Sequence, residues 1–255
     1  MRTSVKQKIK LKNINTKAPA KTDKALCRRE FDKLQNDFFK IQNLFYASHS
    51  YSLLIIFQGI DTSGKDSTIR NVFSHVNPLG VHATSFKAPC DIELEHDYMW
   101  RIFQKLPKKG MIQIFNRSHY EDILVPTIKK TLPRQLIEKR YDFINAFEKH
   151  LLDNKTLVLK FFLHISENEQ KKRIRERLTD PIKKWKYSDE DMKSSKNWKN
   201  YTQVYEQILN RCSPNIPWEI IPADNKWYRN YLVASTIVKQ LKQLNLKFPN
   251  KKNDK

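Results

Sequence analysis

The sequence predicts an α/β protein built on an open, mostly parallel sheet flanked by helices. Short apolar runs that fit buried parallel strands alternate with stretches whose apolar residues recur at helical spacing. One of these runs leads directly into a glycine-framed loop, "GIDTSGKDS". The length of 255 residues suffices for one large domain, and neither an internal repeat nor a second domain is visible.

The first half of the chain carries a long amphipathic helix and three strand patterns. Apolar residues at three- and four-residue steps define the helix, and "SLLIIFQG" is a continuous apolar run. In order, we expect a helix at 24–49, a strand at 52–59, a helix at 66–76, a strand from 80 to about 87, a helix at 94–106, a strand at 111–115 and a helical segment from about 119.

The second half continues the alternation and contains one charged excursion. Ser166 and Glu169 form an S-x-x-E capping box that opens a basic helix. We expect a helix at 136–152, strands at 155–166 and 217–223, and a closing helix at 226–244. Residues 25–244 then form one domain. The segment from about 167 to 200 is too charged for a core and indicates a lid.

The charge is strongly basic, with 48 Lys and Arg against 27 Asp and Glu, a net of +21. Residues 1–24 carry +7 and residues 239–255 carry +5, so +9 remains on residues 25–238. A protein this basic attracts polyanions, which include nucleic acid, an anionic membrane surface and a phosphate-rich substrate. We interpret residues 1–24 as a flexible or loosely docked basic arm and 245–255 as a basic tail, both serving solubility.

Other sequence features favour a cytoplasmic protein without a membrane span. No apolar run approaches the roughly 18–20 residues that a span requires. The N-terminus is basic but lacks the apolar stretch of a secretory signal. Cys27, Cys90 and Cys212 are odd in number, far apart and without metal-ligand spacing, so we interpret them as reduced thiols.

The glycine-framed loop nearly matches a phosphate-binding loop. Gly59, Gly64 and Lys65 fit the G-x-x-x-x-G-K frame between a strand and a helix. Such a loop presents backbone N–H groups and the positive end of the helix dipole to an anion. The alternative is a tight turn that needs glycine only for its geometry. Two of the four glycines in the chain frame this loop, which favours phosphate binding.

Two acids break the expected pattern of the loop. Asp66 stands where a Ser or Thr is usual, and Asp61 lies inside the loop, between the glycines. Both would repel a bare phosphate but would bind Mg²⁺ placed between them and the phosphates. One could instead act as a general base, and Asp66 could simply balance the helix dipole. Ser63 and Ser67 are further candidates for phosphate binding.

A second cluster, "IFNRSHYEDIL", follows the third strand. In phosphate-loop enzymes this edge of the sheet faces the phosphates, and an acid there often completes the metal site. Asn116 takes the usual place of that acid, while Glu121 and Asp122 follow and could supply the carboxylate. Arg117 is placed to bind a transferring phosphoryl group. His119 alone is more typical of a packing residue.

A third cluster is the basic run from Lys171 to Lys186, which has eight basic and two acidic residues. A solvated helix face is the usual explanation of such a run. Here the run follows a core strand, where kinases of small nucleotides carry a lid that closes over phosphates. Arg173 and Arg177 are four residues apart, and Lys184 follows beyond Pro181. We therefore favour a functional lid.

These motifs together resemble the second polyphosphate kinase family, the polyphosphate:nucleotide phosphotransferases. Four segments carry the resemblance: "GIDTSGKDSTIRNVFSHVNPLGVHATSFKAP", "HDYMWRIFQKLPKKGMIQIFNRSHYEDIL", "KFFLHISENEQKKRIRERLTDPIKKWKYSDED" and "WEIIPADNKWYRNYL". Together they cover most of residues 50–235. The resemblance implies a thymidylate-kinase-like fold of the phosphate-loop kinases. It also implies Mg²⁺-dependent phosphoryl transfer between inorganic polyphosphate and AMP, ADP or ATP, and a homo-oligomer, a tetramer in the family.

The resemblance also assigns roles to residues. Asp61, Lys65 and Asp66 become the loop group, and Arg117 the phosphoryl clamp. The "NRSHYED" form resembles the third class of the family, whose members phosphorylate both AMP and ADP, and it moves the metal ligand from Asn116 to Glu121. The cationic groups implied for a polyphosphate chain are Lys87, Arg101, Arg173, Arg177 and Lys184, with Lys226 and Arg229 as further candidates.

The same sequence features allow two other functions. An ordinary ATP-dependent nucleotide kinase could use the same fold, with the basic lid serving ATP alone. A basic nucleic-acid-binding protein belongs to another class. Against the latter, the sequence has no zinc-finger, helix-turn-helix or aromatic RNA-binding signature, only charge, so no specific nucleic-acid partner is expected.

Overall fold

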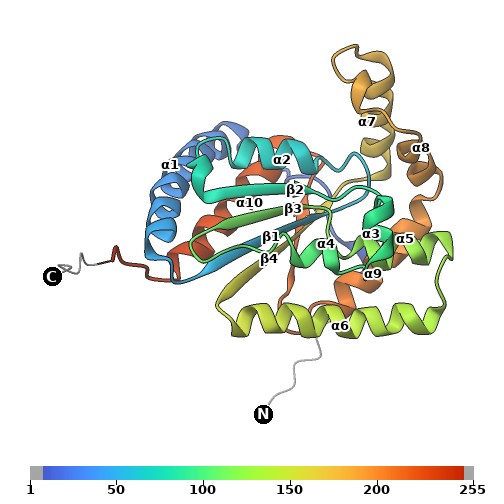
Figure 1. Cartoon of the computed structure of the whole chain (residues 1–255). Coiled ribbons are helices and arrows are strands. Elements are labelled where there is room, and N and C mark those ends of the chain that lie inside the picture. Colours follow the sequence, from blue (N-terminus) through green and yellow to red (C-terminus); the bar gives the residue numbers. More distant parts are fainter. Residues whose placement is uncertain (1–7, 250–255) are drawn as a thin grey trace.

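A computed structural model describes residues 8–249 and confirms the α/β prediction. Five parallel strands form one sheet in the order β2-β3-β1-β4-β5 (Figure 1). The strands are β1 (Ser52–Gln58), β2 (Val81–Ser85), β3 (Ile112–Asn116), β4 (Thr156–His164) and β5 (Trp218–Pro222). Residues 1–7 and 250–255, which belong to the predicted arm and tail, lie outside the described residues.

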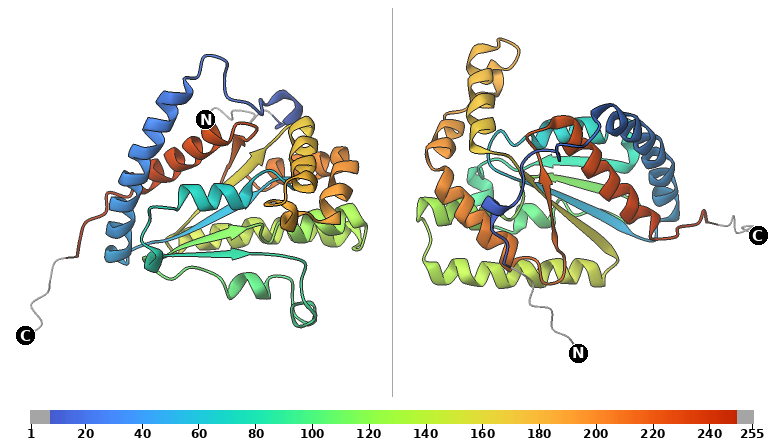
Figure 2. Two further views of the ribbon diagram at one scale, coloured as in Figure 1. Left: turned by 90° about the horizontal axis from the view of Figure 1, so that it is seen from above. Right: turned by 180° about the vertical axis from the view of Figure 1, so that it is seen from behind.

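Helices cover both faces of the sheet (Figures 1 and 2). One face packs against α1 (Lys24–Ser48), α2 (Lys65–Val72) and α10 (Lys226–Lys242), and the other against α5 (Glu121–Lys129), α6 (Arg134–Asp153) and α9 (Trp198–Arg211). The short helices α3 (Asp91–Glu95) and α4 (Trp100–Phe103) lie between β2 and β3 in the chain, while α7 (Glu167–Thr179) and α8 (Asp189–Lys196) project at one end. None of the described helices has the length and apolarity of a membrane span.

The central strand β1 explains the two-layered core. Leu53, Ile55 and Phe57 point into the layer of α1 and α10, while Leu54 and Ile56 point into the layer of α6 and α9. All five side chains are 0 or 1% exposed. Because each such burial contributes about 1.5–3 kcal/mol relative to exposure, the sheet and both helical layers are fixed together. The carboxyl ends of all five strands then lie on one edge.

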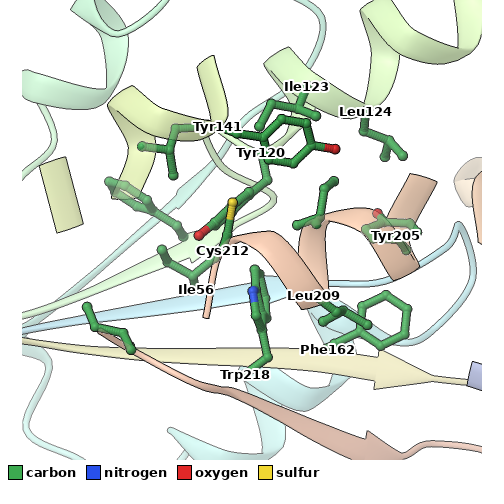
Figure 3. Close-up of a cluster of buried hydrophobic side chains, with 14 of the residues drawn as sticks. Ile56, Tyr120, Ile123, Leu124, Tyr141, Phe162, Tyr205, Leu209, Cys212 and Trp218 are labelled. Carbon is green, nitrogen blue, oxygen red and sulfur yellow. The ribbon is translucent and has the colours of Figure 1, made fainter. Parts of the chain in front are cut away.

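Polar groups are embedded in the core below that edge. Figure 3 shows Tyr120, Cys212 and Trp218 among the apolar side chains of this layer. Lys160 of β4 donates to Glu148 Oε2 (2.6 Å), Tyr120 Oη (3.1 Å) and the Cys212 carbonyl (2.6 Å), which uses all three of its N–H groups. Breaking one partner of such a buried pair is costly, so this cluster fixes the start of α5.

Two predicted elements differ from the structure, and one helix is additional. The helix expected at 94–106 is divided into α3 and α4, because Asp97 Oδ1 accepts from Met99 N (2.9 Å) and starts a new turn. The helix expected to reach Val76 ends at Val72, ahead of Pro78. Helix α9 was not predicted.

The N-terminal segment is docked more firmly than expected of a loose arm. Ile9 N donates to Asn210 Oδ1 (2.7 Å), and Asn210 Nδ2 donates back to the Ile9 carbonyl (2.9 Å). Leu11 N donates to Glu206 Oε1 (2.7 Å), and the Leu11 side chain is 1% exposed. Figure 2 shows this segment running beside α9. A single buried leucine and specific polar pairs therefore hold a segment that its composition marks as a solvated tail.

Candidate active site

The phosphate loop connects β1 to α2 and depends on two glycines. Gly59 has φ +149°, and a Cβ there would lie 2.7 Å from the Leu163 carbonyl oxygen. Gly64 has φ +99° and caps α2 without a side-chain acceptor. The first-turn N–H groups of α2 consequently have neither a helical acceptor nor a side-chain cap, which leaves them able to bind an anion.

Lys65 lies inside the loop. Its side chain is buried, and its Nζ donates to the Gly59 carbonyl at 2.8 Å. Burial and then the charge of Arg117 lower the pKa of Lys65, while the Asp61 and Glu121 carboxylates act in the opposite direction. The ammonium group is thus held at the centre of the predicted loop group.

Arg117 and Asp61 meet across the edge of the sheet. Arg117 follows β3 in the left-handed conformation (φ +62°), and its Nη2 donates to Asp61 Oδ1 at 2.6 Å. Burial alone would lower the pKa of Arg117, but the Glu121 and Asp61 carboxylates outweigh it and raise that pKa. The acid inside the loop is therefore neutralised by the predicted phosphoryl clamp.

Glu121 is the first residue of α5 and lies close to the same pair. Burial raises the pKa of Glu121, although Arg117 and Lys65 act to lower it. In the orientation in which both the oxygen and the nitrogen of the Gln58 amide form hydrogen bonds, the nitrogen donates to Glu121 Oε1 at 3.0 Å. Glu121 and Asp61 both line a cavity of about 540 Å³, and Arg117 lines it with them.

Asp66 and Asn116 form a separate pair. Asn116 Nδ2 donates to Asp66 Oδ1 (2.6 Å) and to Ser85 Oγ (3.2 Å), and neither Asn116 nor Asp66 lines the cavity. In residues 8–249 no group of three His, Cys, Asp or Glu side chains is arranged to hold a metal. Asp61 and Glu121 nevertheless suit Mg²⁺, which usually takes one or two carboxylates and completes its shell with phosphate oxygens and water.

Two of the cations predicted to bind polyphosphate, Lys87 and Arg101, line the cavity in different ways. Lys87 is exposed and lines the cavity. Arg101 also lines it but is buried, donates to the Lys87 carbonyl (2.9 Å), and lies 3.5 Å from Glu93 and from Asp122. Arg101 therefore builds the wall, whereas Lys87 is accessible to an anion.

The residues predicted to form a lid are also dispersed. Arg177 is paired with Asp191 at 2.6 Å, which joins α7 to α8, and Lys184 is exposed beyond the end of α7. Arg173 is buried below the loop. Ser63 is also buried, while Ser67 donates to the Gly64 carbonyl at 2.9 Å.

Several residues that line the cavity were not predicted from the sequence. Tyr201 and Tyr205 come from the unpredicted α9, and Arg140 comes from α6 and stacks on the Tyr98 ring at 4.1 Å. The spacing of the two tyrosines, four residues apart on one helix face, is the signal that could have found them. Nothing in the sequence marks Arg140.

Arg229 of α10 adds a further positive charge behind the loop. Its Nη2 donates to Ser67 Oγ at 3.1 Å, its Nη1 has no hydrogen-bond partner, and the side chain is 1% exposed. Burial, followed by the charge of Arg173, lowers the pKa of Arg229. A Cβ at Gly64 would lie 2.2 Å from Nη1, so this guanidinium fills the space that glycine provides.

Comparison with known proteins agrees with this geometry. The family model of polyphosphate kinase 2 matches residues 21–249. The AMP/ADP-polyphosphate phosphotransferase of Meiothermus ruber is 46% identical over 211 residues, covering 82% of this chain and 79% of that protein. The ADP-polyphosphate phosphotransferase of Rhodopseudomonas palustris is 37% identical over 237 residues, covering 88% and 81%.

A solved structure extends the agreement to the fold. The crystal structure of polyphosphate kinase 2 from Arthrobacter aurescens TC1 superposes with a TM-score of 0.93 at 34% identity, covering 98% of this chain and 91% of that chain. The predicted resemblance and the phosphate-loop kinase fold are both confirmed. The chain belongs to the polyphosphate kinase 2 family.

Proposed function

We propose that this protein transfers phosphoryl groups between inorganic polyphosphate and adenine nucleotides, converting AMP to ADP and ADP to ATP, with Mg²⁺ as cofactor. The reverse reaction, which lengthens polyphosphate, belongs to the same proposal. One observation carries it: Asp61, Lys65, Arg117 and Glu121 converge at the carboxyl ends of β1 and β3, and three of them line one cavity. The similarity to the AMP/ADP-polyphosphate phosphotransferase of Meiothermus ruber and the ADP-polyphosphate phosphotransferase of Rhodopseudomonas palustris supports it.

The cavity suits the nucleoside part of a nucleotide. Its walls include the aromatic side chains of Phe86, Tyr201 and Tyr205 and the apolar side chain of Leu124. Charged side chains also line the cavity, and a site that combines apolar and aromatic walls with placed charged groups is typical of small-molecule binding. Asp61, Arg117 and Glu121 lie at the phosphate-loop side of the cavity, so the phosphates of the acceptor are proposed to point to the loop.

The transfer needs positioning and charge neutralisation more than covalent chemistry. The transferring group passes through a metaphosphate-like transition state with charge on its equatorial oxygens. In this mechanism the loop N–H groups and Lys65 hold the phosphates. Arg117 exchanges its bond to Asp61 for one to the transferring group. Asp61 and Glu121 would hold Mg²⁺, and the bound ion would supply charge neutralisation and orientation of the phosphate oxygens.

The polyphosphate chain needs a longer cationic surface than the nucleotide. Its charge is roughly one per phosphate, so it binds to spaced cations. Lys87 at the cavity, Lys184 beyond α7 and Lys226 at the start of α10 are exposed cations that fit this role.

An assay without ATP tests the proposal. The pure protein is incubated with Mg²⁺, long-chain polyphosphate and either AMP or ADP, and the nucleotides are separated by anion-exchange chromatography. We expect ADP and ATP to form in the AMP reaction and ATP in the ADP reaction, with loss of both in EDTA and recovery on adding excess Mg²⁺.

Other outcomes would favour the alternatives. Phosphorylation of AMP only when ATP is the donor would favour an ordinary nucleotide kinase. No transfer, together with DNA binding at physiological salt that competing polyphosphate does not reduce, would favour a nucleic-acid-binding protein.

A further inference from the structure

The first turns of α7 contact the backbone of the phosphate loop from below. Gln170 Nε2 donates to the Asp61 carbonyl at 3.3 Å. Arg173 Nη1 donates to the carbonyls of Thr62 (3.0 Å) and Ser63 (3.1 Å). Three consecutive carbonyls of the loop, separated from α7 by more than 100 residues of sequence, are thus bound by two side chains of one helix.

The other donors of Arg173 are also used. Its Nε donates to Glu169 Oε1 (2.8 Å), and its Nη2 donates to the carbonyls of Ala223 (2.8 Å) and Asp224 (3.2 Å) after β5. A guanidinium has five N–H groups, and five acceptors surround this one. The residue is 7% exposed. This geometry does not leave Arg173 free to bind polyphosphate, which was its predicted role, and places it between the lid helix, the loop and the end of β5.

Binding the carbonyls orients the N–H groups of the same peptides. In a trans peptide the C=O and N–H bonds point in opposite directions. Because the Ser63 carbonyl points to Arg173, the Gly64 N–H points away from it. The Asp61 carbonyl, bound by Gln170, fixes the Thr62 N–H in the same way. Thr62 has φ +66°, a left-handed conformation that a residue with a Cβ adopts only when its surroundings hold it.

We propose that Arg173, with Gln170, is a positioning residue that holds the phosphate loop in its anion-binding form and couples the lid helix α7 to it. Without this guanidinium the buried Thr62 and Ser63 carbonyls lose their donors. The Ser63 N–H still donates to the Ile60 carbonyl at 3.0 Å, so the Ser63–Gly64 peptide is the one that can rotate until its carbonyl replaces its N–H at the phosphate. The expected changes in kcat and KM rest on the proposed function, whereas the expected change in triphosphate affinity rests on anion binding alone.

Three variants test it in the full-length protein. Arg173→Lys keeps the charge but cannot reach all the acceptors, Arg173→Ala removes the group, and Arg175→Lys is the matched control. Arg175 is on the same helix and is exposed, and its Nε donates to the Lys171 carbonyl of the same helix at 3.4 Å. Measured quantities are kcat and KM for ADP, the thermal midpoint, and the affinity for inorganic triphosphate by calorimetry.

We expect Arg173→Lys to lower kcat by roughly 10- to 100-fold, since small misplacements of binding groups have effects of this size. The KM for ADP should change less, because the nucleoside cavity is intact. Triphosphate affinity should fall by about tenfold, and Arg175→Lys should match the wild type. Millimolar guanidinium, but not methylammonium, should restore part of the activity of Arg173→Ala.

Wild-type kcat and triphosphate affinity in folded Arg173→Lys would overturn the inference. So would an activity loss that follows only a lower thermal midpoint. If Arg173→Ala does not fold, the Lys variant and Gln170→Leu carry the test. A wild-type protein that binds triphosphate but transfers nothing would refute the proposed function, and the triphosphate comparison would still decide the role of Arg173.

Discussion

At the scale of single residues, the site is a balance of opposite charges at the end of a strand. The sequence raises the question of why a phosphate loop contains Asp61, and the structure places that carboxylate 2.6 Å from Arg117. Lys65 and Glu121 are part of the same electrostatic cluster. On the proposed function, carboxylates and cationic side chains are present together because phosphoryl transfer with Mg²⁺ would need both.

The substitution Glu121→Gln separates stability from activity. Burial raises the pKa of Glu121 above its ordinary value of 4.5, so the folded state holds this proton more tightly than the unfolded state. Ionisation therefore opposes folding, and the opposition grows as pH rises from about 4.5 through the raised pKa. We expect the variant to have a higher thermal midpoint at pH 7 and a difference that shrinks toward pH 4.5.

Activity should change in the opposite direction. Loss of the carboxylate should lower kcat by about 10²-fold or more, a usual effect of removing one charge-stabilising group. Calorimetric melting and initial rates between pH 5 and 8 give both quantities, with the exposed Glu95→Gln as control. A variant that is less stable than the wild type at pH 7 would show that the Glu121 carboxylate is not destabilising.

At the scale of elements, the phosphate loop depends on backbone geometry that only glycine provides. Gly59→Ala places a Cβ 2.7 Å from a backbone oxygen at φ +149°. We expect a loss of roughly 1–3 kcal/mol of folding free energy. We also expect kcat to fall further than the unfolded fraction explains, because the loop must shift. Denaturant unfolding and initial rates check the two effects.

Gly110→Ala is the matched control for this experiment. Its Cβ would lie 2.8 Å from the Tyr46 carbonyl oxygen at φ +79°, so the strain is similar, but it is remote from the loop. This variant should lose stability and keep its kcat per folded molecule. Equal kcat losses in the two variants would contradict a specific role of Gly59.

The N-terminal segment gives a second prediction at this scale. Leu11 is 1% exposed and packs in the core layer of α6 and α9. Leu11→Ala should lower the free energy of unfolding by about 2–4 kcal/mol, the range typical of buried leucines. Urea denaturation measures it, with the exposed Lys12→Ala as control. A change below about 0.5 kcal/mol would mean that the segment is not docked in solution.

The elements differ in how far the sequence predicts them. The strands β1, β3, β4 and β5 and the helices α1, α6 and α10 carry strong hydrophobic patterns, whereas the edge strand β2 (VHATS) does not. The structure has all of these elements within a few residues of the expected bounds. Helix α9 and the division into α3 and α4 were not predicted. The charged residues that precede α9 obscured the helical spacing of its apolar residues. The division into α3 and α4 depends on the hydrogen bond from Met99 N to Asp97 Oδ1, which a hydrophobic pattern does not reveal.

At the scale of the whole molecule, the parallel sheet gathers the site. The loop after β1, the turn after β3, the start of α7 after β4 and the turn after β5 all lie on one edge (Figure 1). Motifs with a chemical signature, such as the loop and "NRSHYED", could therefore be assigned from sequence. The place of Arg173 could not, because its partners are backbone carbonyls more than 100 residues before it and about 50 residues after it.

We propose that the phosphoryl group moves from polyphosphate to a nucleotide at the cluster of Asp61, Lys65, Arg117 and Glu121. The most direct measurement uses polyphosphate labelled with radioactive phosphorus, unlabelled ADP and Mg²⁺, with wild type and Asp61→Asn compared at equal folded fraction. The account predicts labelled ATP from the wild type and a loss of at least about 10²-fold in the variant, whose melting curve stays close to that of the wild type. Labelled ATP at near wild-type rates from Asp61→Asn would contradict the site assignment, and the absence of label in ATP from the wild type would contradict the reaction itself.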